Sequence, residues 1–282
     1  MFWKWVSSMR KFALIGHPLG HSLSPQIHER LFKLDGFSDS YELLDIPPKK
    51  LAESFELLRK FEGLNITIPH KIEIIPMCDE LDKTAKRYGA INCIKNQGGK
   101  IIGYNTDVLG FVKSIEQLGT TLKSDVLLLG CGGAGRMIAL ETLYQEGNLT
   151  IAVRKDDLKV AYDLVEYARD VIPTAKAKVV LIDEIKGKFN LLVNSTPVGM
   201  YPKSDNMPVS IDVIKNVNFV FDLVYNPTPT KLVKTALANG ARAKGGMAML
   251  VLQAVAAHEI WDNSTYNNTD INSLISEMEQ SV

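Results

Sequence analysis

The sequence contains few cysteines and no excess of either charge. Its three cysteines, Cys78, Cys93 and Cys131, are an odd number and form no C-x-x-C pair, which argues against a disulfide framework or a zinc site. Unpaired thiols fit a reducing compartment, so we expect a cytoplasmic protein. Lysine plus arginine equals aspartate plus glutamate at 32 each. This balance argues against a general nucleic-acid binder, which usually carries a basic excess.

Long apolar runs are also absent. No run approaches the roughly 18 residues that a membrane span needs, and the five histidines show no metal-ligand spacing. We therefore expect no membrane segment and no metal. Residues 1–8 precede a second methionine, Met9. Their apolar stretch is too short for a signal peptide. We interpret them as an extension outside the core; a short anchor that packs Trp3 and Trp5 on the surface is the alternative.

One stretch organises the rest of the chain. The apolar run 126–129 runs into Gly130-x-Gly132-x-x-Gly135, and an apolar helix pattern begins at Met137. A G-x-G-x-x-G match between a strand and a helix predicts a dinucleotide site. The glycines permit a tight turn and close approach to a pyrophosphate, which the helix N-terminus attracts. The alternative is a glycine-rich turn that holds no ligand.

The next predicted strand, 149–153, ends in two cations, Arg154 and Lys155. An NAD site usually has an acidic residue here, to hold the ribose 2′-hydroxyl. Two cations instead favour a 2′-phosphate, and therefore NADP, and Arg154 can make a planar two-point contact with it. Asp156 and Asp157 follow. We interpret them as caps of the next helix, but they leave NAD open.

Strands and helices alternate through the second half of the chain. This order predicts a doubly wound α/β sheet. Polar strings at 194–200 and 222–226 follow the predicted strands 189–194 and 219–224. Ligands in such sheets bind at the carboxyl ends of the strands, so both strings are candidate ligand contacts.

The first half of the chain predicts a second α/β region. Expected strands cover 11–16, 41–46, 64–68 and a hairpin over 93–102, with a helix over 78–88. Ser22 and Ser24 lie between the first strand and the helix that starts at Pro25. Ser24 suits a helix cap, but Ser22 has no capping role, so the two hydroxyls could bind a small polar ligand.

Three further positions carry polar chemistry. Lys71 follows a strand at a predicted helix N-terminus, where the dipole disfavours an ammonium; an ordinary surface lysine is an equal alternative. Asp107 ends an Asn-Thr-Asp string whose competing interpretation is a turn and helix cap. Gln253 lies in an apolar helix, where its amide needs partners, either backbone groups or a ligand hydroxyl.

Together these segments resemble shikimate dehydrogenase, in the same order, from about Met9 to about Trp261. The segments that carry the resemblance are Ser22-Leu-Ser24-Pro25, Asn65-Ile-Thr67-Ile-Pro-His-Lys71, Gly89-Ala-Ile-Asn92, Asn105-Thr-Asp107, Gly130-Cys-Gly-Gly-Ala134, Asn194-Ser-Thr-Pro-Val-Gly-Met200 and Met249-Leu-Val-Leu-Gln253. The resemblance implies a two-domain enzyme. A substrate-binding catalytic domain covers 9–108 and is completed by 247–282, and a Rossmann-type NADP-binding domain covers 109–246.

The resemblance also implies the reaction and its residues. Enzymes of this family interconvert 3-dehydroshikimate and shikimate with NADP in aromatic amino-acid biosynthesis. By position, Lys71 and Asp107 correspond to the catalytic pair. The implied substrate contacts are Ser22, Ser24, Thr67, Lys71, Asn92, Asp107, Tyr225 and Gln253. The implied cofactor contacts are Gly130, Cys131, Gly132, Gly133, Ala134, Val153, Arg154, Lys155, Leu223 and Gly246.

This chain departs from the family pattern at two places. Val153-Arg154-Lys155 replaces the usual Asn-Arg-Thr, and Ala248 replaces the second glycine of Gly-x-Gly-Met-Leu. A quinate/shikimate dehydrogenase with relaxed use of NAD and NADP therefore remains an alternative, as does a non-catalytic dinucleotide or metabolite sensor. The sequence leaves the oligomeric state open and is compatible with a homodimer.

Overall fold

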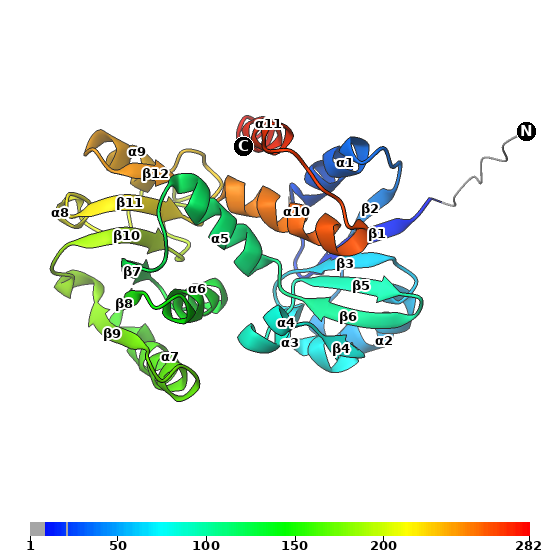
Figure 1. Ribbon diagram of the computed structural model, residues 1–282, viewed down its shortest axis with the longest axis horizontal. Helices are drawn as coiled ribbons and strands as arrows, with labels where there is room; N and C mark the ends of the chain where they lie inside the picture. The colour runs from blue at the N-terminus through cyan, green and yellow to red at the C-terminus, as the bar shows by residue number, and fades with distance from the viewer. Residues whose placement is uncertain (1–8, 21) are drawn as a thin grey trace, which may run out of the picture. The chain divides into compact units, whose positions relative to one another are not determined.

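The computed structural model describes residues 9–20 and 22–282, and the chain divides into two compact units. The first unit comprises the chain up to Leu109 together with Gln253–Leu274, and the second comprises Gly110–Leu252 and Ile275–Val282. Each unit combines a sheet with helices, which confirms the α/β fold class (Figure 1). The predicted extension, 1–8, lies outside the described residues.

The first unit is built on a six-stranded mixed sheet. Its strands are β1 (Lys11–Gly16), β2 (Ser40–Asp45), β3 (Gly63–Ile66), β4 (Glu80–Leu81), β5 (Cys93–Gln97) and β6 (Lys100–Tyr104), in the order β2-β1-β3-β5-β6-β4. Strand β1 pairs in parallel with β2 and β3, whereas β5 is antiparallel to both β3 and β6. Strands β3 and β6 therefore run in the same direction, and the chain leaves both at one edge of the sheet.

Helices and single turns complete this unit. They are α1 (Ser24–Leu34), η1 (Pro48–Lys50), α2 (Leu51–Leu58), α3 (His70–Glu73), η2 (Ile75–Met77), α4 (Lys83–Tyr88) and the later turns of α10 (Met247–Asp262). One core cluster joins α2 to the sheet through Phe55, Leu58, Ile15 and Ile66. Burial of these apolar side chains is the main stabilising contribution to the unit.

Two local predictions for this unit are wrong. The helix expected over 78–88 begins only at Lys83, because Glu80–Leu81 pairs with β6 as strand β4. Asp82 then caps α4, its carboxylate accepting a hydrogen bond from the Ala85 amide at 2.8 Å. Ser24 is not a helix cap either: the cap position is Leu23, and Ser24 is the first helical residue. Its hydroxyl therefore has no capping role.

A pair of buried histidines joins α1 to α10 within the first unit. His28 Nδ1 lies 3.0 Å from His258 Nε2, and neither side chain is exposed. His28 stacks on Tyr41 at a centroid distance of 4.1 Å. His258 faces Asp35, Asp262 and Arg10, with its Nδ1 3.5 Å from the Asp35 carboxylate. Burial lowers the pKa of His258 to about 4 and holds the pKa of His28 well below its usual value.

Acidification should therefore destabilise this unit. In the unfolded chain both histidines titrate near pH 6.5. Between that value and about pH 4 the unfolded chain binds protons that the folded chain does not, so the free energy of unfolding falls as pH is lowered. Urea titrations of the wild type and His28→Phe, which keeps a ring but binds no proton, measure this effect. The variant should lose less stability on acidification; equal losses would contradict the assignment.

The second unit is built on a six-stranded parallel sheet. Its strands are β7 (Asp125–Leu129), β8 (Asn148–Val153), β9 (Lys176–Leu181), β10 (Phe189–Asn194), β11 (Val217–Asp222) and β12 (Arg242–Lys244), in the order β12-β11-β10-β7-β8-β9. Every paired neighbour is parallel. Numbered within the sheet this order is 3-2-1-4-5-6, the Rossmann order. It confirms the predicted doubly wound sheet.

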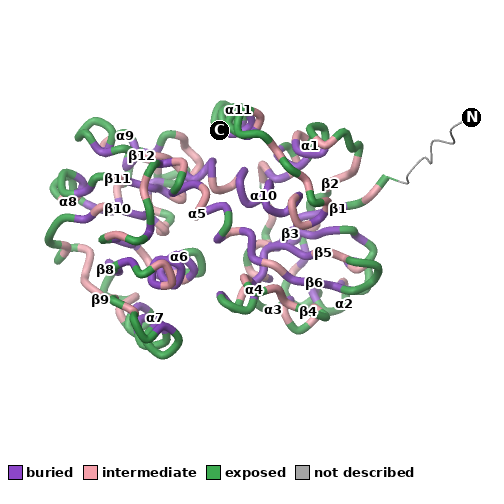
Figure 2. The backbone as a smooth tube through the Cα atoms, viewed as in Figure 1, coloured by how far each residue is buried: buried purple, intermediate pink, exposed green. Residues whose placement is uncertain are grey.

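The remaining helices and single turns belong wholly or partly to the second unit. They are α5 (Asp107–Leu118), α6 (Gly133–Tyr144), η3 (Lys155–Asp157), α7 (Leu158–Val171), η4 (Ile182–Glu184), α8 (Ile211–Ile214), α9 (Lys231–Ala238) and α11 (Asn268–Glu279). The central strands β7 and β10 are almost wholly buried, as Figure 2 shows. The strand order reverses between β7 and β10, and ligands of such sheets bind at the carboxyl ends beside this reversal.

Candidate active site and cofactor site

Lys71 and Asp107 form an ion pair in the first unit. Lys71 lies in α3, which follows β3, and Asp107 is the first residue of α5, which follows β6. Because β3 and β6 run in the same direction, both side chains emerge at one edge of the sheet. Lys71 Nζ donates to Asp107 Oδ2 at 2.6 Å, and the side chains are 32% and 22% exposed. Solvent and small molecules can therefore reach the pair.

Asn92 fixes the orientation of the Asp107 carboxylate. Its side-chain amide donates to Asp107 Oδ1 at 2.8 Å and to Thr106 Oγ1 at 2.9 Å. Its carbonyl oxygen accepts from the backbone amide of Thr106 at 2.6 Å. The two carboxylate oxygens of Asp107 thus have separate partners, Lys71 and Asn92. A buried amide with both ends bonded holds the carboxylate in one orientation.

Gln253 belongs to the same network. Its Oε1 lies 3.4 Å from Asn92 Nδ2 and 3.5 Å from Thr106 Oγ1, and the residue is buried. The sequence left a backbone bond or a ligand hydroxyl as the alternatives for this amide; the structure gives it side-chain neighbours in the candidate site. The residues of the Asn-Thr-Asp string have different roles. Asn105 Oδ1 accepts a hydrogen bond from the Val108 amide at the start of α5, whereas Asp107 forms the ion pair with Lys71.

The two predicted serines lie together before α1. Ser22 Oγ accepts the backbone amide of Ser24 at 3.2 Å. Ser24 is buried and within hydrogen-bonding reach of Tyr41, whose hydroxyl donates to Asn65 Oδ1 at 2.8 Å. Asn65 Nδ2 in turn donates to the backbone carbonyl of Asn92 at 3.3 Å. Polar contacts therefore link the serines to the network around Asp107.

Sequence reasoning assigned no role to Tyr41, Asn65 or Thr106. Asn65 and Thr106 stand inside segments that carry the resemblance, so their polarity was a usable signal. Tyr41 gave none beyond its place in a strand. Burial holds the pKa of Tyr41 well above its usual value, so the phenol remains a hydrogen-bond donor. Thr67, predicted as a substrate contact, is half-buried after β3, where its backbone amide donates to Ile15.

The glycine-rich turn of the second unit presents an anion site. Gly130 has a φ of +87°, a conformation that favours glycine. Helix α6 begins at Gly133, earlier than the Met137 expected from the apolar pattern. The amides of Gly133, Ala134 and Gly135 have no acceptor within the described part of the chain. Free amides at a helix N-terminus attract a phosphate, so this turn fits a dinucleotide pyrophosphate.

The glycines of this turn should differ sharply in their tolerance of a side chain. A Cβ on Gly135 would lie 2.7 Å from Ser195 Oγ and 2.8 Å from the Gly130 carbonyl, whereas one on Gly133 meets nothing within 4 Å. We expect Gly135→Ala to lower the stability of the cofactor-free protein by about 1–3 kcal/mol. Gly133→Ala should leave it unchanged. Thermal unfolding of both variants tests this, and equal melting temperatures would contradict the close packing.

The end of β8 presents the predicted adenosine end of the site. Arg154 is 77% exposed and its Nε and Nη2 both contact Asp157 Oδ2 at 3.3 Å. Asp157 does occupy the cap position of α7, but its carboxylate makes no cap bond and faces Arg154 instead. Val153 and Cys131 are buried, and burial raises the pKa of the Cys131 thiol. Lys155 is exposed beside them.

The remaining predicted residues follow β11. A Cβ on Gly246 would lie 2.1 Å from the Leu223 carbonyl, so only glycine fits there. A buried network holds this region: Asp222 accepts from Asn194 at 2.8 Å and from Thr230 at 2.7 Å. Burial raises the pKa of Asp222. Tyr225, in the same segment of the second unit, is half-buried.

The Rossmann strand order and the glycine turn with its free amides define the class of the second unit, a dinucleotide-binding domain. Throughout 9–20 and 22–282 no group of three His, Cys, Asp or Glu side chains could hold a metal, and no helix there is long and apolar enough to cross a membrane.

Comparison with known proteins identifies the family. The family model described as the shikimate dehydrogenase substrate binding domain matches residues 14–94. The shikimate dehydrogenase (NADP(+)) of Caldanaerobacter subterraneus subsp. tengcongensis is 37% identical over 93% of this chain and 94% of its own. That of Halothermothrix orenii is 39% identical over 90% and 91%. The chain belongs to the shikimate dehydrogenase family.

A solved structure agrees with this assignment. The shikimate 5-dehydrogenase from Thermus thermophilus, in complex with NADP(H) and shikimate, superposes with a TM-score of 0.84 at 29% identity. The match covers 95% of this chain and 99% of that one. The resemblance in the sequence is therefore confirmed for both units.

Proposed function

We propose that this protein catalyses the reversible, NADP-dependent reduction of 3-dehydroshikimate to shikimate, in the pathway to the aromatic amino acids. The observation that carries the proposal is the Lys71–Asp107 pair, held by Asn92 and open to solvent. A sensor that only binds a metabolite has no need of an exposed amine bonded to an oriented carboxylate. The curated relatives are named for this activity and this cofactor.

In the proposed mechanism Lys71 moves the proton. Its Nζ would donate a proton to the carbonyl oxygen during reduction and accept it during oxidation. Asp107 would accept a hydrogen bond from the neighbouring substrate hydroxyl while holding the amine in place. Ser22 and Ser24 would bind the substrate carboxylate, since they supply hydroxyl donors in the same unit. Asn92, Thr67 and Gln253 of the same unit would bind the other polar groups of the substrate.

The cofactor residues of the proposal fit NADP. The free amides at the start of α6 would hold the pyrophosphate, and Arg154 would contact the 2′-phosphate through its exposed guanidinium. Leu223 and Gly246 would line the nicotinamide end, where the absence of a side chain on Gly246 lets the two backbone segments pack closely. When bound, the cofactor supplies the hydride that the protein cannot.

Arg154→Ala should change the cofactor preference. Loss of charge-assisted hydrogen bonds to a phosphate costs about 1.5–3 kcal/mol, or roughly 10- to 100-fold in kcat/KM for NADP. The kcat/KM for NAD should hardly change, because NAD has no 2′-phosphate. Lys155→Ala is the comparison and should have a smaller effect, since a lysine makes no two-point contact. Equal losses with NADP and NAD would remove Arg154 from the specificity site.

A spectrophotometric assay tests the whole proposal. The purified protein is given shikimate or quinate, each crossed with NADP or NAD, and nicotinamide reduction is followed. We expect the fastest reduction with shikimate and NADP. Comparable rates with quinate or NAD would favour the relaxed quinate/shikimate dehydrogenase, and no reduction in any combination would favour the sensor.

The proposal extends to location and assembly. Free cysteines at 78, 93 and 131 support a reducing compartment, and we propose the cytoplasm. We also propose that the protein forms a homodimer; sedimentation of the purified protein as a monomer would contradict this.

A further inference from the structure

The sheet of the second unit has a pocket of about 470 Å³ at its amino-terminal edge. The first residues of four neighbouring strands line it: Asp125 of β7, Asn148 of β8, Lys176 of β9 and Phe189 of β10. The glycine turn and Arg154 follow the carboxyl ends of β7 and β8. Within this unit the pocket therefore lies at the edge opposite to the dinucleotide residues, and the proposed reaction gives it no role.

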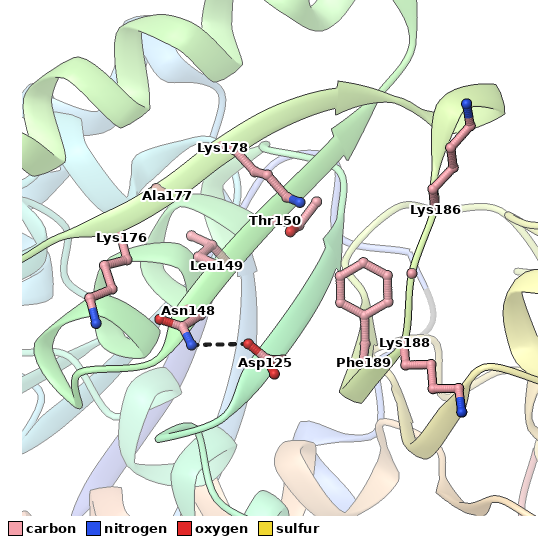
Figure 3. A pocket seen from close by; sticks show the side chains of 11 residues that line it. Asp125, Asn148, Leu149, Thr150, Lys176, Ala177, Lys178, Lys186, Lys188 and Phe189 are labelled. Carbon is pink, nitrogen blue, oxygen red and sulfur yellow. Dashed lines mark hydrogen bonds between the residues drawn. The ribbon is translucent and has the colours of Figure 1, made fainter.

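The pocket exists because one crossover lacks a helix. Parallel neighbours are usually joined by an α-helix that covers the sheet. Between β9 and β10 the chain forms only the short turn η4 and an extended loop. Thr150 and Lys178 are paired neighbours on β8 and β9, and both line the pocket that this loop leaves open. Figure 3 shows the loop residues Lys186 and Lys188 across from them.

Four lysines surround this pocket without an ion-pair partner. Lys176, Lys178, Lys186 and Lys188 line it, and none has an ion pair or hydrogen bond with any described residue. Some other exposed lysines of the unit have carboxylate partners, namely Lys123 with Glu146, Lys159 with Asp163 and Lys215 with Asp212. Single lysines such as Lys155 and Lys234 have none among the described residues, but at the pocket four such lysines are grouped in one lining. Asp125 is the single carboxylate in the lining, and it accepts from Asn148. Grouped like charges create a positive potential that attracts anions.

A threonine hydroxyl in the lining of the pocket supplies a second, independent observation. Thr150 is only 5% exposed. Its hydroxyl makes no hydrogen bond with the described residues, although it lines the pocket. Because this oxygen is not one of the buried atoms that lack a partner, it is open to water or a ligand in the pocket. Figure 3 shows the Lys178 amine beside this threonine, so a hydroxyl donor and an ammonium are available to one ligand.

We propose that this pocket binds a small metabolite bearing two or more phosphate charges. Lysine ammoniums are compact charges that suit phosphate, and a threonine hydroxyl can donate to a phosphate oxygen. The volume exceeds that of a single phosphate, and the Phe189 ring offers an apolar wall for the rest of the molecule. The site does not depend on the proposed dehydrogenase activity.

Equilibrium dialysis with labelled inorganic pyrophosphate tests the site in the full-length protein. Saturating NADP keeps the probe out of the cofactor site. We expect one pyrophosphate per chain with a dissociation constant of about 1 mM or tighter. Lys178→Ala should weaken binding at least about tenfold, which is about 1.4 kcal/mol. The matched control Lys234→Ala removes an exposed lysine elsewhere in the unit and should bind as the wild type does.

The hydroxyl is tested separately. Thr150→Val removes the donor at nearly constant volume, and Thr150→Ser restores it. Binding should be lost in the first variant and recovered in the second, which a merely structural role for the side chain does not predict. Absence of saturable binding by the wild type, or equal binding by Lys178→Ala, would overturn the proposal. Binding that is abolished by Arg154→Ala but not by Lys178→Ala would assign the probe to the cofactor site and would also overturn it.

Discussion

Replacement of Lys71 by alanine should lower turnover by roughly two to four orders of magnitude, the usual contribution of a general acid–base group. The Michaelis constant for shikimate should change much less. The physical reason is that Lys71 Nζ is the exposed donor of the pair and would carry the proton, whereas binding is shared among many polar groups. Steady-state kinetics in both reaction directions measures the effect.

A matched lysine provides the control. Lys83 is exposed at the start of α4 in the same unit, and Lys83→Ala should retain full activity. Lys71→Met, which keeps the length of the apolar stem, should be as inactive as the alanine variant. Near wild-type turnover in either Lys71 variant would mean that another group moves the proton.

Asp107→Asn should be the second most damaging change, lowering kcat/KM by roughly 10²- to 10³-fold. The substitution keeps the shape but removes the charge that holds the Lys71 amine at 2.6 Å. It also sets an amide where Asn92 now donates to Oδ1 at 2.8 Å. Because Asp107 would contact the substrate directly, both turnover and the Michaelis constant should worsen, unlike the expectation for Lys71.

Glu73→Gln separates this effect from a general loss of negative charge. Glu73 lies in the same short helix as Lys71, and its carboxylate is 54% exposed. This control should behave as the wild type does. If Asp107→Asn changed only the Michaelis constant and left turnover intact, Asp107 would be a binding group alone.

The fold was largely predictable because its signals are local. The buried runs of β7 and β10 and the glycine turn between β7 and α6 specify strand, turn and helix without reference to distant residues. The structure of region 78–88 could not be predicted in this way, because Glu80–Leu81 becomes a strand only by pairing with β6, about twenty residues later. Pairing with a distant strand leaves no periodic pattern in so short a segment.

The candidate site was predictable in its members but not in its connections. Lys71, Asn92 and Asp107 were named from the sequence. Only the structure shows that Lys71 donates to one carboxylate oxygen of Asp107 while Asn92 donates to the other. Tyr41 was missed for the same reason, since its hydrogen bond to Asn65, a residue distant in the chain, has no sequence signature. The basic pocket was missed because its lysines come from separate segments and gather only where a crossover helix is absent.

The most direct test of the account is reduction of 3-dehydroshikimate by NADPH, measured side by side for the wild type and Lys71→Ala with the product identified by chromatography. The account predicts that the wild type oxidises one NADPH for each shikimate formed, and that the variant is at least about a hundredfold slower. Failure of the wild type to form shikimate, or equal rates in the two proteins, would contradict it.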